Sequence, residues 1–255
     1  MAIEIFNRYE HKYKMDMDAF HKVLEVMDEH MELDKHCANH SLYTIANIYY
    51  DTPDNTLIRE SLSKPVYKEK MRLRSYGVPG MNTKVFLEIK KKFNGLVNKR
   101  RTTLKLDEAY DFIKSGISPE IKDYMNAQVV HELEYFMQRY SLSPKVYIAY
   151  DRLAYFEKGN DDLRISFDTN IRTRRHDVAL ENGDYGTKLI SDDIRLMEIK
   201  TSSAMPLWLC KMLSDLNLRK TSFSKYGTEY QNMLRSETNK TYYFIMTKPS
   251  YLNSI

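Results

Sequence analysis

One short segment places cations at every second position. In YKEKMRLRSYG, residues 67–77, these cations are Lys68, Lys70, Arg72 and Arg74. In an extended strand they would share one face, with neighbouring side chains about 7 Å apart. Like charges that close repel one another. The face is therefore expected either to contact water or to lie against a strongly anionic ligand.

Other segments repeat the alternation of charged and apolar residues. They are RYEHKYK, VFLEIKKK, LVNKRRTTLKL, DLRISFD and RLMEIKT, and their charged positions are mostly Lys and Arg with a few carboxylates. For any single strand, a half-exposed antiparallel sheet with its charged face in water explains the pattern equally well. The repetition across strands favours a shared basic interior.

A basic interior suits a ligand that carries many phosphates. Charges buried without partners cost several kcal/mol each, so roughly ten enclosed cations would require anions. Arginine grips phosphate oxygens with two parallel hydrogen bonds, and lysine acts as a point charge. The carboxylates could hold a divalent metal, since Mg²⁺ takes one or two carboxylates together with phosphate oxygens. The pattern predicts a site for triphosphate or polyphosphate.

The elements that position these residues are mainly strands. Because the strands do not alternate with helices, a parallel sheet is disfavoured. An α+β fold is predicted, in which antiparallel strands form a barrel or a sandwich with helices packed outside. The predicted strands are 5–14, 43–50, 66–76, 83–91, 95–106, 145–156, 163–168 and 194–200, and the predicted helices are 16–31, 106–116, 120–140, 206–216 and 226–235.

Length and composition narrow the class of protein. The 255 residues, 42% hydrophobic, suffice for one domain over residues 1–255, with a core of about 5–237 and a tail of 238–255. A net charge of +4 is too small to imply nucleic-acid binding from bulk charge. Cys37 and Cys210 form no metal-binding spacing and no disulfide framework. No apolar stretch approaches the ~20 residues that span a bilayer, so a cytoplasmic protein without a membrane segment is expected.

Eight motifs resemble those of a known family. RYEHKY, YYDTPDN, KMRLRSYG, FLEIKKKFNG, YIAYDRLAYF, LRISFDTNI, LMEIKT and SFSKYG occur in the family's order between residues 6 and 227. They resemble the vacuolar transporter chaperone (VTC) polyphosphate polymerase domain, within the CYTH-like triphosphate tunnel metalloenzymes. The resemblance implies a closed eight-stranded antiparallel barrel. Its basic interior would bind triphosphate or polyphosphate with Mn²⁺ or Mg²⁺.

The resemblance also implies roles for individual residues. As catalytic groups it implies Arg72, Arg74, Arg164, Lys90 and Glu198. Its further phosphate-binding residues are Lys12, Lys200, Ser224 and Lys225, and the metal would be held by Glu198 and Glu10. The strand faces add Lys70, Lys99, Arg101 and Arg152 as phosphate-binding candidates. Arg152 could equally lie away from the interior, and Glu88 is expected to pair with a neighbouring cation in preference to a metal.

The function that follows is ATP-dependent polyphosphate polymerisation. The γ-phosphate of ATP would be transferred to a growing polyphosphate chain inside the tunnel. Two alternatives remain open, a metal-dependent inorganic or organic triphosphatase and a non-enzymatic sensor of nucleotide or polyphosphate. The single inner-face glutamate of the first strand, Glu10, disfavours a two-metal triphosphatase. The expected partners are ATP and polyphosphate or triphosphate, without nucleic acid, and a membrane protein that exports the product is left open.

Overall fold

The computed structural model describes residues 9–94, 96–202 and 204–246. Its described strands form one antiparallel sheet in which eight follow the order β1-β10-β8-β7-β3-β4-β5-β6, while β2 pairs with β7 and β9 with β8. These strands are β1 (Tyr9–Met15), β2 (Met31–Leu33), β3 (Tyr43–Asp51), β4 (Tyr67–Tyr76), β5 (Lys84–Phe93), β6 (Leu96–Lys105), β7 (Ser143–Glu157), β8 (Asn160–Arg174), β9 (Thr187–Lys188) and β10 (Arg195–Thr201).

Helices connect and cover the strands. They are α1 (Met17–His30), the 3₁₀ helix η1 (Lys35–His40), α2 (Thr56–Leu62), α3 (Leu106–Ser115), α4 (Ala127–Arg139), α5 (Leu207–Asp215) and α6 (Lys225–Met246). All eight predicted strands are present, although residues 5–8 of the first lie outside the described part. The short elements β2, η1, α2 and β9 were not predicted. Every helix in the described part of the chain is too short or too polar to cross a bilayer.

Two helix boundaries differ from the prediction. The predicted helix 120–140 begins only at Ala127, because the side chain of Asn126 accepts a hydrogen bond from the backbone N–H of Val129 and caps the helix there. The last helix runs past the predicted 235 to Met246, so the first part of the predicted tail is helical. Residues 247–255 lie outside the described residues.

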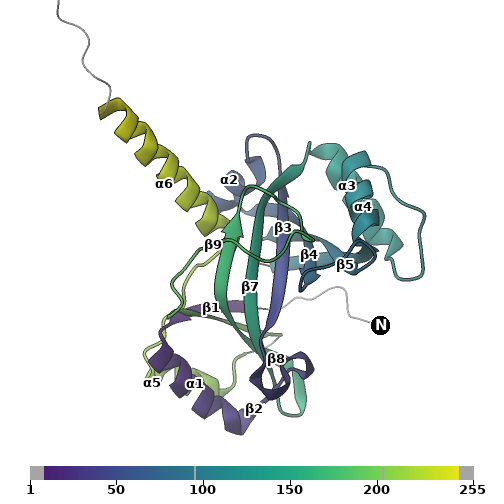
Figure 1. Ribbon diagram of the computed structural model, residues 1–255. Coiled ribbons are helices and arrows are strands. Elements are labelled where there is room, and N and C mark those ends of the chain that lie inside the picture. The colour runs from purple at the N-terminus through teal and green to yellow at the C-terminus, as the bar shows by residue number, and fades with distance from the viewer. Residues whose placement is uncertain (1–8, 95, 203, 247–255) are drawn as a thin grey trace, which may run out of the picture.

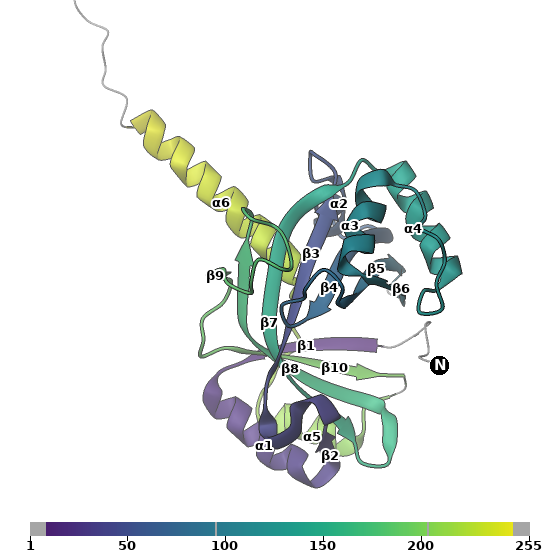
Figure 2. The ribbon, with the colours of Figure 1, turned by 45° about the vertical axis from the view of Figure 1, so that its right-hand side comes forward.

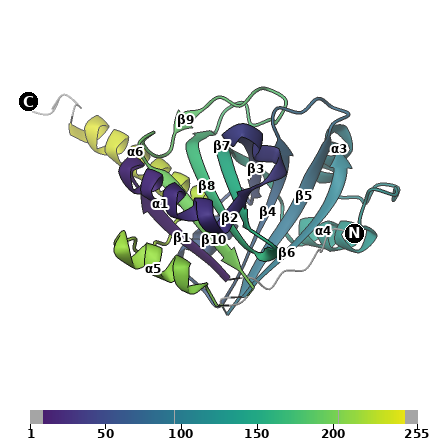
Figure 3. The same ribbon diagram turned by 90° about the horizontal axis from the view of Figure 1, so that it is seen from below.

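The apolar face of the sheet is covered by two helix pairs. Helices α3 and α4 cover β3 to β6, where Leu87 and Phe112 share one buried cluster. Helices α1 and α5 cover β1, β10, β8 and part of β7, where Met27 and Ile165 share another. Figure 3 shows the two pairs on opposite sides of the curved sheet. The opposite, charged face of the strands is therefore turned inward, and is called the inner face below.

The sheet curves back on itself but does not close. Lys90 Nζ on β5 lies 3.7 Å from Glu10 Oε2 on β1, although these strands lie near opposite ends of the strand order. No backbone ladder joins the described residues of β1 and β6. The predicted closed eight-stranded barrel is thus wrong, since the sheet is open and has ten described strands. Closure would require the backbones of β1 and β6 to approach to the ladder spacing of about 4.8 Å, whereas the described residues of β1 pair with β10 and those of β6 pair with β5.

The start of α6 is anchored on the inner face. Tyr226 is buried, stacks on Tyr49 with ring centroids 4.9 Å apart, and donates a hydrogen bond of 3.0 Å to Asp51 Oδ2. This contact places Ser224 and Lys225 beside the charged strands. Beyond its first turns the helix projects away from the rest of the molecule (Figures 1 and 2).

Candidate functional site

Strand register arranges the inner-face charges in rows. Lys70 on β4 lies opposite Lys90 on β5, which lies opposite Lys99 on β6. In the next row, Arg72 lies opposite Glu88, which lies opposite Arg101. Residues far apart in sequence are thereby brought onto one surface by backbone pairing alone.

Glu88 is the central anion of the β4–β6 part of this surface. It is 1% exposed, and its carboxylate lies 2.6 Å from Arg72 Nε and 2.6 Å from Lys99 Nζ, with Arg74 Nε at 4.0 Å. Burial opposes ionisation, but the three cations outweigh it and hold the pKa of Glu88 well below its usual value. The expectation that Glu88 pairs with cations is confirmed.

Two neutral side chains fix the arginines further. Arg72 Nη1 donates to the hydroxyl of Tyr49 at 3.2 Å, and Arg74 Nε donates to Asn47 Oδ1 at 2.9 Å. The guanidinium groups are therefore held in place by the protein. Little rotamer freedom remains to be lost when an anion binds.

Glu198 is the central anion of the opposite part. Four cations surround its carboxylate, at 3.2 Å (Lys12), 3.3 Å (Arg152), 3.5 Å (Lys200) and 3.6 Å (Lys225). Burial opposes its ionisation, but these cations together hold the pKa of Glu198 well below its usual value. Burial also lowers the pKa of Lys200, to about 8, despite its contact with Glu198. Arg152 thus lies on the inner face, which is one of the two positions that the sequence left open for it.

Asp168 is a second buried carboxylate in this part, and it was not among the predicted site residues. It is fully buried and accepts two hydrogen bonds from Arg152, of 2.6 and 2.9 Å, and one from Lys225. The alternation of DLRISFD places it on the charged face, which was the available signal. Its cation partners come from β7 and α6 and depend on the strand order.

Glu10 and Glu198 test whether the inner face could hold a metal. Both carboxylates lie 3.2 Å from Lys12 Nζ, so they converge on one point. Burial opposes the ionisation of Glu10, yet Lys90 and Lys12 lower its pKa to about 2. Within the described residues, no group of three or more His, Cys, Asp or Glu side chains is arranged to hold a metal ion. With Lys12 between them, these two carboxylates would hold a divalent ion only together with phosphate oxygens that supply the other ligands.

Lys70 differs from Lys90 and Lys99 in the same row, because no carboxylate of the described residues lies within ion-pair distance of it. Its Nζ lies 3.4 Å from Ser224 Oγ and 5.9 Å from the ring centroid of Tyr226. Burial, and then repulsion by Lys90, Lys68 and Lys12, lower the pKa of Lys70 to about 7. An anion bound here would restore its charge.

The two remaining arginines lie toward the other end of the inner face. Arg164 Nη2 donates to Asp34 Oδ2 at 3.1 Å and to the Tyr43 hydroxyl at 3.3 Å. The guanidinium of Arg101 lies over the ring of Phe86, 4.9 Å from its centroid. All predicted site residues thus lie on the inner face. Most belong to the Glu88 group or the Glu198 group, while Lys70 contacts Ser224, and Arg101 and Arg164 lie apart.

Comparison with known proteins identifies the family. The profile of the VTC domain matches residues 7–234. The chain belongs to the VTC domain family. No curated protein sequence matches this VTC domain.

Solved structures resemble the chain at low sequence identity, and the first of them has a TM-score above 0.5. A candidate adenylate cyclase from Bacillus halodurans superposes on this VTC domain with a TM-score of 0.53 and 12% identity, over 87% of this chain and 96% of that one. One from Vibrio parahaemolyticus has a TM-score of 0.48 and 14% identity, over 88% and 98%. A candidate adenylyl cyclase from Hippeastrum with a dominant triphosphatase activity has a TM-score of 0.48 and 12% identity, over 90% and 96%.

Proposed function

We propose that this VTC domain is an ATP-dependent polyphosphate polymerase. The observation that carries the proposal is the inner face, where fixed arginines, lysines and Ser224 surround four carboxylates that already have cation partners. Glu10, Glu88, Asp168 and Glu198 each contact at least one Lys or Arg. Against the effect of burial, neighbouring cations hold the pKa of all four carboxylates below its usual value, which makes them poor bases toward water and favours a phosphate acceptor over hydrolysis.

The proposed reaction is a transfer between phosphates. A terminal oxygen of the polyphosphate chain attacks the γ-phosphorus of ATP and forms the new P–O bond. The bond from that phosphorus to the β,γ-bridging oxygen breaks, and ADP leaves with the electron pair. The attacking phosphate is already anionic, so no general base is required. The protein contributes position and positive charge, the main terms in phosphoryl transfer.

The inner-face cations and carboxylates would have different roles in this reaction. Arg72 and Arg74 would bind the triphosphate and stabilise the charge that develops in the transition state, with Lys70, Lys90 and Arg164 alongside. Glu198 and Glu10 would hold Mn²⁺ or Mg²⁺, whose charge would help to neutralise phosphate oxygens.

The test is incubation with ATP and Mn²⁺, with and without a short polyphosphate primer, followed by gel separation of the products and assay of free phosphate. A ladder with ADP and little free phosphate is expected. Free phosphate without a ladder would indicate a triphosphatase instead, and ATP binding without turnover would indicate a sensor.

Two variants connect the activity to the inner face. Glu198→Gln and Arg72→Ala are expected to abolish the ladder. Their controls are Glu132→Gln on α4 and Arg59→Ala on α2, both of which lie away from the inner face. Loss of activity in the controls would contradict the assignment.

A further inference from the structure

The two ends of the inner face differ in chemistry. At one end, which we call the lysine end, Lys68 lies opposite Lys92 and Lys70 lies opposite Lys90. Like charges directly opposite one another destabilise a sheet. Among the described residues, only Lys90 of these four contacts a carboxylate, that of Glu10 at 3.7 Å. The lysine end therefore carries positive charge that the protein itself leaves largely uncompensated.

The other end, which we call the aromatic end, consists of Tyr43, Tyr76 and Phe86 on three adjacent strands. The ring centroids of Tyr43 and Tyr76 are 5.9 Å apart, and those of Tyr76 and Phe86 are 5.8 Å apart. Tyr76 is 51% exposed, so its ring is accessible. Arg101 and Arg164 flank this group, over Phe86 and at the Tyr43 hydroxyl.

Strand β4 joins the two ends in a defined order. From Tyr76 the inner-face residues of β4 are Arg74, Arg72, Lys70 and Lys68, in that order. The strand covers about 26 Å between Tyr76 and Lys68 at about 3.3 Å per residue. A nucleoside triphosphate has the same order of chemistry, an aromatic base followed by a row of phosphates. Bases stack on aromatic side chains, and phosphates bind Arg and Lys.

We propose that the nucleotide binds in one direction, with its base on Tyr76 at the aromatic end, its triphosphate along Arg74 and Arg72, and the polyphosphate chain at the lysine end. The assignment rests on the proposed function and adds Tyr76, Lys68 and Lys92 as residues that determine which ligand binds where. The γ-phosphate then faces Lys70 and Lys90, where it meets the end of the chain.

The base position is tested by calorimetric titration of ATP and of inorganic tripolyphosphate, in EDTA so that turnover does not intervene. Tyr76→Ala should lower the affinity for ATP by about five- to tenfold, the lower part of the range for one stacked base. Its affinity for tripolyphosphate, which has no base, should not change. Tyr76→Phe keeps the ring and should bind ATP as the unmodified protein does.

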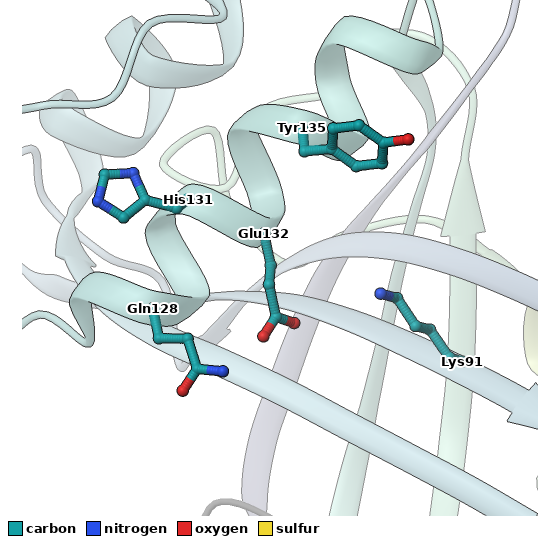
Figure 4. Close-up of a pocket in the computed structure, with 5 residues that line it drawn as sticks. All are labelled: Lys91, Gln128, His131, Glu132 and Tyr135. Carbon is teal, nitrogen blue, oxygen red and sulfur yellow. The ribbon is translucent and has the colours of Figure 1, made fainter.

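The chain position is tested with long-chain inorganic polyphosphate. The double variant Lys68→Ala/Lys92→Ala should bind it several-fold more weakly and bind ATP with unchanged affinity. Matched controls lie on the outer side of the sheet, in a surface hollow of about 350 Å³ between β5 and α4. Lys91→Ala is the control for the lysine variant, because Lys91 is next to Lys92 in sequence but lies on the outer face (Figure 4). Tyr135→Ala is the control for Tyr76→Ala, because it removes an exposed tyrosine on the outer side.

The outcomes separate the two proposals. If the unmodified protein binds neither ATP nor tripolyphosphate, the proposed function fails. If it binds both, and Tyr76→Ala weakens both equally or neither, the direction of binding is wrong while the proposed function stands. A loss of ATP affinity in the lysine variant, with none in Tyr76→Ala, would reverse the assigned direction.

Discussion

Glu88 shows how a single carboxylate allows several cations to share one surface. It neutralises Arg72 and Lys99 from a position that is almost fully buried. Glu88→Gln keeps the shape but leaves the half-buried Arg72 and Lys99 without their shared anion, so the free energy of unfolding should fall by about 3 kcal/mol, the lower end of the range for breaking a buried pair. Urea denaturation at pH 7 measures this change. Glu25→Gln, at an exposed position on α1, is the control, and equal stability of the two variants would contradict the role of Glu88.

Lys70 makes anion binding sensitive to pH. Its pKa of about 7 means that it loses its proton as the pH rises through neutrality, whereas an ordinary lysine stays charged. A bound anion favours the charged form, so affinity for tripolyphosphate should fall between about pH 6 and 8. The groups facing Lys70 are Lys12, Lys68, Lys90 and Asp51.

The measurement for Lys70 is a comparison of binding isotherms across this pH range. Lys70→Arg keeps a permanent positive charge, so its affinity should decline less than that of the unmodified protein. Titration of the ligand, and of Lys99 and Lys200, is common to both proteins and cancels in the difference. Parallel profiles would show that Lys70 does not titrate at the site.

At the scale of elements, α6 completes the inner face from the end of the chain. It is linked to β3 by the hydrogen bond that Tyr226 donates to the buried Asp51. Asp51 also accepts hydrogen bonds from the backbone N–H groups of Leu57 and Ile58 at the start of α2. Tyr226→Phe removes a hydrogen bond to a buried carboxylate and should lower the free energy of unfolding by about 1.5–3 kcal/mol. Urea denaturation detects it.

The control for Tyr226→Phe is a variant that removes a tyrosine hydroxyl at the surface. Tyr124 donates to Glu108 on α3, and Tyr124→Phe should change the stability little, because a surface contact of this kind competes with water. If Tyr226→Phe is as stable as this control, the Asp51 contact does not anchor the helix.

At the scale of the whole molecule, the inner face concentrates positive charge in a chain whose net charge is only +4. A polyanion should therefore stabilise the folded state by binding it and not the unfolded chain. At a hundred times its dissociation constant, tripolyphosphate should add about 2.7 kcal/mol, visible as a higher melting temperature. Sodium sulfate at the same ionic strength is the control. Equal shifts in both salts would mean that the charge is not organised as a site.

Much of the local structure could be predicted from the sequence, because strand periodicity is a local property. The two-residue spacing of Lys70, Arg72 and Arg74 was enough to put them on one face, and all the predicted site residues lie on the inner face. The predicted start of α4 was wrong, because the sequence does not show that the side chain of Asn126 accepts a hydrogen bond from the Val129 N–H and caps the helix.

The sequence by itself determined the eight main strands, the charged face and the family. The tertiary structure decided which ion pairs form and that the sheet stays open. Asp168 pairs with Lys225, and Glu10 pairs with Lys90. Both pairs join residues that are far apart in the sequence. The open edge between β1 and β6 likewise depends on how far the sheet curves. Such contacts are set by pairing and curvature, to which the whole sheet contributes, whereas alternation along a strand is set by neighbouring residues alone.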